Sequence, residues 1–181
     1  MKKKSDNISN QTKLYLEYKD TIEKLNKYFE RDSLMVFEEF EGVLKNSFDD
    51  GEWEFSIKSD RKYHQVYKTH WSMKGLFIHY EFWVSGNNIL TRPDMYLMVD
   101  VEGRNRELFL TEFEKEYPEL ENYFTSNNIS YRPDNRKNAI AHKIFENYFK
   151  PDYKEENMLP DEISKFRFLD EVIDDVLERI M

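Results

Sequence analysis

WEFSIK at residues 53–58, LFIHYEFWV at residues 76–84 and MYLMVDVE at residues 95–102 all alternate apolar and polar side chains. A period of two places successive side chains on opposite faces of an extended chain, so each segment is predicted to be a β-strand. Residues 63–71 alternate less regularly and are predicted to form a further strand. The links between these segments are short, which favours an antiparallel meander.

A fifth segment, AIAHKIF at residues 139–145, is consistent either with a strand or with the start of a helix. The sequence therefore predicts an antiparallel sheet of four or five strands. Apolar residues at steps of three and four predict amphipathic helices around this sheet. The expected helices are two N-terminal ones divided at Asp32-Ser33, a central one at 107–124 with a kink or split at Pro118, and a C-terminal one at 160–180.

These elements predict an α+β fold, in which the sheet packs against N-terminal, central and C-terminal helices. The chain has 181 residues, a length that suits one domain. Residues 1–9 are lysines and small polar residues and are expected to be a disordered tail. Residues 10–181 are expected to form a single α+β domain, with Ser9 or Asn10 as the N-cap of its first helix.

Composition excludes several classes of protein. The chain has no cysteine, which rules out disulfides and thiolate metal sites. No apolar run approaches the roughly 20 residues of a membrane span, and no apolar stretch follows the basic N-terminus as in a signal peptide. We therefore expect a cytoplasmic protein without a membrane contact. Frequent Lys, Asn, Tyr, Phe and Ile point to an AT-rich bacterial or phage gene.

The charge is strongly negative. The net charge is −9, and residues 151–181 hold ten acidic but only four basic side chains. Negative proteins repel phosphate backbones, so nucleic acid is not an expected partner. A protein partner with a basic surface suits this charge better.

Several short motifs recur in order between residues 53 and 145. They are YKTHW at 67–71, IHYEF at 78–82, YLMVDVEG at 96–103, Phe109, Phe113, Leu120-Glu121 and ISYR at 129–132. In these motifs and in the order of its elements, this part of the chain resembles the accessory α+β domain found C-terminal to PD-(D/E)XK nuclease-like domains in uncharacterised bacterial restriction- or defence-type proteins. The resemblance implies a bacterial or phage nucleic-acid defence or conflict setting, and it implies no established activity.

The polar side chains of two strands are the candidate site. His79 and Glu81 alternate with the apolar set of one strand, and Asp100 and Glu102 do so on the next. A hairpin of the two strands would bring an imidazole and three carboxylates together, a set that can bind a divalent cation. The simpler interpretation is an ordinary solvated sheet face.

The same face also carries apolar side chains, which are Phe77, Trp83, Tyr96 and Met98. Their exposure to water would be costly, so two arrangements are expected. In the first, a helix or loop of the same chain covers them, and the C-terminal segment is the candidate cover. In the second, they contact a protein partner.

No catalytic motif or cofactor-binding loop is present, and neither catalytic residues nor cofactors are expected. Pro93-Asp94 and Asp100-Val101-Glu102 approach a nuclease pattern, but Glu102 stands where that pattern needs Lys. We therefore expect a non-catalytic protein-interaction domain. The alternatives are a metal-dependent PD-(D/E)XK-like nuclease and an acidic inhibitor or immunity protein that blocks a basic surface. The C-terminal helix is expected to pack on its own chain or, alternatively, to join two copies as a homodimer.

Overall fold

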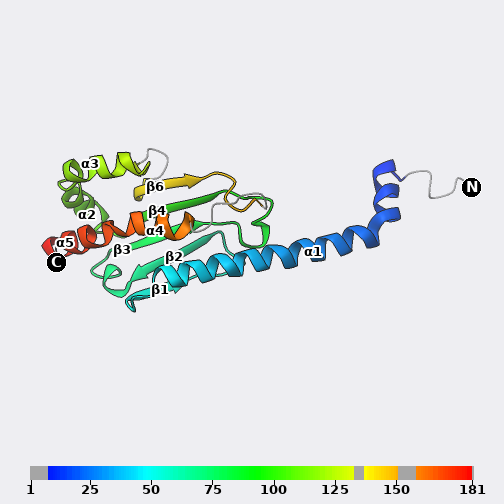
Figure 1. Cartoon of the computed structure of the whole chain (residues 1–181), viewed down its shortest axis with the longest axis horizontal. Coiled ribbons are helices and arrows are strands. Elements are labelled where there is room, and N and C mark those ends of the chain that lie inside the picture. Colours follow the sequence, from blue (N-terminus) through cyan, green and yellow to red (C-terminus); the bar gives the residue numbers. More distant parts are fainter. Residues whose placement is uncertain (1–7, 133–136, 151–157, 181) are drawn as a thin grey trace, which may run out of the picture.

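The computed structural model describes residues 8–132, 137–150 and 158–180, which form six β-strands and five α-helices (Figure 1). The strands form one antiparallel sheet in the order β1-β2-β3-β4-β6-β5. Their bounds are β1 Trp53–Ser56, β2 Tyr63–Lys68, β3 Phe77–Trp83, β4 Met95–Glu102, β5 Ser130–Tyr131 and β6 Ala139–Phe145.

The predicted α+β class and antiparallel pairing are confirmed, but the predicted count of four or five strands is too low. Residues 139–145 form a strand, β6, which pairs with β4. The two-residue strand β5 then pairs with the outer edge of β6. Two residues are too few to carry a period-two signal, so the alternation rule does not count such a strand.

Strands β3 and β4 form the centre of the sheet and fix its two faces. Seven residue pairs are in register, among them Tyr80 with Val99 and Phe82 with Leu97. These four side chains and Ile78 are fully buried on the face that the helices cover, which we call the core face. The assignment of faces from the alternating pattern is therefore correct.

Helix α1, Asn10–Ser47, runs without interruption through the break predicted at Asp32-Ser33. Asp32 pairs with the neighbouring Arg31, whose Nη2 lies 2.7 Å from Asp32 Oδ1, and Ser33 is buried inside the helix. Asp and Ser favour a helix start only where the residues before them are not helical. Here the helical spacing of apolar residues continues on both sides of the pair, so the helix does not end. The predicted N-cap Ser9 is confirmed, since its Oγ accepts the Thr12 backbone N–H at 3.1 Å.

The central and C-terminal helices are each divided into two. Helices α2, Arg106–Phe113, and α3, Tyr117–Ser126, confirm the split at Pro118, which lies in the first turn of α3 where its missing N–H breaks no hydrogen bond. The single helix predicted at 160–180 is instead α4, Met158–Arg167, followed by α5, Leu169–Ile180. The break lies at Phe168, whose ring stacks on Tyr123 of α3 at 4.2 Å.

All five helices pack on the core face. Phe40 of α1 contacts Phe82, the Tyr80 hydroxyl lies 3.1 Å from the Phe166 backbone carbonyl of α4, and Phe113 of α2 contacts Tyr131. Helices α4 and α5 thus close the core of their own chain. This arrangement supports the interpretation that the C-terminal helix packs on its own chain. The apolar stripe of α5 is buried against the core face.

The first prediction concerns this core. Replacement of Phe82 by Ala should lower the free energy of unfolding by about 3–5 kcal/mol, because a fully buried ring is lost and a cavity remains. Urea denaturation of both chains measures the change. The control is Ile144→Ala on the other face, where the side chain is 48% exposed and truncation should have little effect. Equal losses in the two variants would mean that the faces are assigned wrongly.

Candidate functional site

The face of the sheet opposite the helices holds the predicted site residues, and we call it the mixed face. The β3–β4 register places His79 opposite Asp100 and Glu81 opposite Met98. At the two ends of the strands, Phe77 lies opposite Glu102 and Trp83 lies opposite Tyr96. The predicted hairpin and its neighbours are therefore present.

The centre of the mixed face is not solvated. His79 is 0% exposed, Met98 1%, and Glu81 and Asp100 8% each. Side chains towards the ends of β3 and β4, such as Glu102, are half-buried. The interpretation of these polar residues as an ordinary solvated face is wrong, because bulky side chains on the neighbouring strands shield them.

The aromatic residues of this face shield one another across the strands. Phe77 stacks on His79 at 4.4 Å between ring centroids and contacts Tyr67 of β2 at 5.0 Å. Trp83 contacts Tyr63 at 4.9 Å and Tyr96 at 6.0 Å. The C-terminal segment was the expected cover, but α4 and α5 lie on the core face instead.

His79 is held on one side only. Its Nε2 lies 3.1 Å from Gln65 Nε2 and 3.5 Å from Glu81 Oε2. Its Nδ1 is buried and has no hydrogen-bond partner within the described part of the chain. One nitrogen of the ring is thus engaged, and the other is available.

Glu81 is an ionised acceptor in this arrangement. It receives hydrogen bonds from the Trp83 indole N–H and from Gln65 Nε2, the latter at 3.4 Å. Burial by itself raises the pKa of the Glu81 carboxyl, but the hydrogen bonds from His79, Trp83 and Gln65 outweigh it and hold the pKa below its ordinary value. Glu81 is therefore a charged hydrogen-bond acceptor next to the imidazole, with its Oε2 3.5 Å from His79 Nε2.

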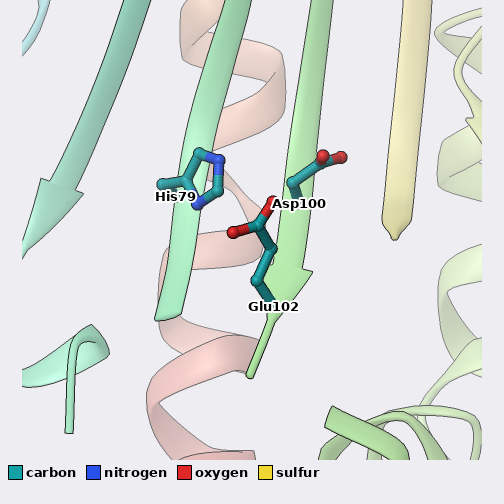
Figure 2. Close-up of side chains that lie close together, drawn as sticks. All are labelled: His79, Asp100 and Glu102. Carbon is teal, nitrogen blue, oxygen red and sulfur yellow. The ribbon is translucent and has the colours of Figure 1, made fainter. Parts of the chain in front are cut away.

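Three of the four predicted polar residues form one cluster. A nitrogen of His79 and one carboxylate oxygen each of Asp100 and Glu102 all lie within 4.8 Å of one another. Figure 2 shows the Glu102 side chain folding back from the end of β4, so that its carboxylate lies between the imidazole and Asp100. Glu81 is not a member of this cluster.

Sequence reasoning missed a second feature, the first part of α1. Residues 10–32 extend away from the sheet (Figure 1), and none of them is buried. We call this part the arm. Its large apolar side chains are 45–60% exposed, and they are Leu14, Tyr15, Leu16, Tyr18, Leu25 and Tyr28. Their helical spacing was evident in the sequence, but a stripe alone does not show whether anything packs against it.

The role of Asp174 was also missed. Its carboxylate accepts from Lys68 Nζ at 2.7 Å and from Trp71 Nε1 at 2.6 Å, and His70 Nε2 lies at 2.7 Å. Burial raises the pKa of Asp174, but these partners outweigh it and the pKa is lowered. Asp174 therefore ties α5 to the end of β2 and is a structural group.

A cleft of 920 Å³ lies beside α1, α4 and α5 and is lined by Lys68 and Arg167, among others. Neither cation is available for an anion. Lys68 pairs with Asp174. Arg167 pairs with Asp50 and, at 3.1 Å, with Asp170. The cleft is consequently a weaker candidate than the mixed face.

No family model, curated protein or solved structure matches the chain. The resemblance to the nuclease-associated accessory domain therefore stays a prediction. Among the described helices, none combines the length and the apolar character that a membrane crossing requires.

The second prediction concerns Glu81. The change Glu81→Gln should lower the free energy of unfolding by about 1–3 kcal/mol at pH 7, because a buried charged acceptor is lost. A lowered folded-state pKa contributes stability above the ordinary Glu pKa and loses it as pH falls through the folded value. The difference between wild type and variant should therefore shrink below about pH 4.

Urea denaturation at neutral and acidic pH measures this dependence. The control is Glu54→Gln on β1, where the carboxylate is exposed and the same change should have little effect. A difference that stays constant across the pH range would contradict the ionised state of Glu81.

Proposed function

We propose that the chain is a non-catalytic protein-interaction domain, and that its contact element is the arm, residues 10–32. The observation that carries the proposal is the exposed apolar surface of the arm. Leu14 is 60% exposed and Leu25 is 59% exposed on a helix that leaves the sheet (Figure 1). Exposed apolar surface of this extent is typical of a contact with a partner.

The arm has a stripe suited to another helix. Leu14, Tyr18, Ile22, Leu25 and Phe29 recur at steps of three and four, which puts them along one side. An isolated helix of this length is only marginally stable in water, and tertiary or quaternary packing normally provides the rest of its stability. Burial of the stripe against a partner helix would supply that packing.

A second copy of the chain is the partner that the charge favours. The arm carries five basic and five acidic side chains and is neutral, whereas the whole chain has a net charge of −9. Two arms can therefore approach without net repulsion. An antiparallel pair would also keep the two acidic bodies apart.

The setting of this interaction comes from the resemblance, and it is a bacterial or phage nucleic-acid defence or conflict system. The acidic inhibitor is a weaker proposal, since the exposed apolar stripe lies in the neutral part of the chain. The nuclease alternative has support only in the cluster of His79, Asp100 and Glu102. The Lys of the nuclease pattern is replaced by Glu102 in that cluster.

The third prediction concerns self-association. The full chain should have twice its monomer mass of 22.2 kDa in light scattering at tens of micromolar. Leu25→Asp should weaken the dimer at least about tenfold, because it places a charge in the paired stripe. The matched control is Leu16→Asp, which is equally exposed at 58% but lies on the opposite side of the helix and should leave the dimer intact.

Analytical ultracentrifugation gives the two dissociation constants, and circular dichroism shows that both variants keep their helices. A wild-type chain that is monomeric throughout this range would refute self-association through the arm. Equal weakening by both variants would mean that the stripe is not the contact.

The fourth prediction separates the domain from a nuclease. We expect no Mg²⁺- or Mn²⁺-dependent cleavage of DNA or RNA by the purified chain. Glu102 occupies the position of the required Lys, and Asp94 accepts the Asn147 backbone N–H at the opposite end of β4, at 2.7 Å. Plasmid-nicking and RNA assays test this. Cleavage that Glu102→Ala abolishes would favour the nuclease instead.

A further inference from the structure

We propose that His79, Asp100 and Glu102 bind one divalent transition-metal cation on the mixed face. The three donor atoms lie within 4.8 Å of one another and come from two hydrogen-bonded strands. Bond lengths of about 2.1 Å place tetrahedral ligand atoms roughly 3.4 Å apart, so small side-chain rotations suffice to close the site. The rigid pair of strands fixes the three Cα positions.

The unused nitrogen of His79 is independent evidence for a ligand. The side chain is 0% exposed, and Nδ1 has no hydrogen-bond partner among the described residues. A buried polar atom without a partner is rare and destabilising. Figure 2 shows the carboxylates of Asp100 and Glu102 on one side of this ring. A cation between them and the ring would be coordinated by a nitrogen of His79.

Glu81 lies beside the proposed ligand His79. Its Oε2 is 3.5 Å from His79 Nε2, and its other carboxylate oxygen accepts the Trp83 indole N–H, so the carboxylate is held next to the ring. A carboxylate on the far nitrogen of the ring is the usual arrangement behind a metal-binding histidine, and Glu81 is accordingly a positioning residue.

The donor set selects the class of cation. One imidazole and two carboxylates suit Zn²⁺, Co²⁺ or Mn²⁺, whereas Mg²⁺ and Ca²⁺ prefer oxygen donors alone. Two carboxylates also neutralise the charge of the cation, which matters where Asp100 is buried. The half-buried Glu102 leaves one side of the site accessible to the ion.

Titration of the tag-free, chelator-treated full chain with Zn²⁺, Co²⁺ and Mg²⁺ tests the proposal by calorimetry. We expect one Zn²⁺ or Co²⁺ per chain and much weaker Mg²⁺ binding. Asp100→Asn and Glu102→Gln should each weaken Zn²⁺ binding at least about tenfold, which is a typical loss for a disturbed metal site. The matched control is Glu54→Gln, an exposed acid on β1, which should leave the affinity unchanged.

The ¹⁵N resonances of the His79 ring provide a second measurement. A cation bound by acidic side chains alone would leave these resonances unchanged. In ¹⁵N-labelled protein, the His79 Nδ1 resonance should shift on Zn²⁺ addition. Glu102→Gln is isosteric at the end of β4, so it tests the site even if Asp100→Asn fails to fold. Absence of Zn²⁺ binding, unchanged affinity in Glu102→Gln, or an unmoved His79 resonance would each overturn the proposal.

Discussion

The seven-pair register between β3 and β4 is the constraint on which the rest of the structure depends. It aligns Tyr80 with Val99 on the core face and, one residue away, His79 with Asp100 on the mixed face. Since side chains alternate with a period of two, a slip of one residue would exchange the two faces of a strand. Such a slip would move the apolar side chains off the core face. The free-energy cost of losing their burial therefore keeps the polar cluster in register.

The helical layer is attached to this sheet by buried polar contacts as well as by packing. The Tyr80 hydroxyl donates to Asp170 Oδ1 at 2.5 Å, while Lys68, His70 and Trp71 converge on Asp174 one helical turn later. Burial raises the pKa of the Asp170 carboxyl, whereas its hydrogen bonds from Tyr80 and Arg167 work in the opposite direction. These directional contacts specify where α5 lies, which apolar packing alone does less well.

Periodicity was sufficient to predict the central strands, their faces and the residues of the polar cluster. It failed where the outcome depended on tertiary context. Asp32-Ser33 has the composition of a helix start, yet the helix continues there. The burial of His79 depends on aromatic residues from neighbouring strands, which no single strand reveals. Likewise, the stripe of the arm has the same spacing as a buried stripe, and only the fold shows that nothing in the described chain covers it.

The exposure of the arm has a consequence for how the sequence can change over time. None of residues 10–32 is buried, so the body loses little stability when they are replaced. Under the proposed function, recognition and folding belong to different parts of one continuous helix, with Phe37, Phe40 and Leu44 anchoring its second part. If the arm binds a partner as proposed, its binding preferences can change by substitution without the destabilisation that usually limits the evolution of a contact surface.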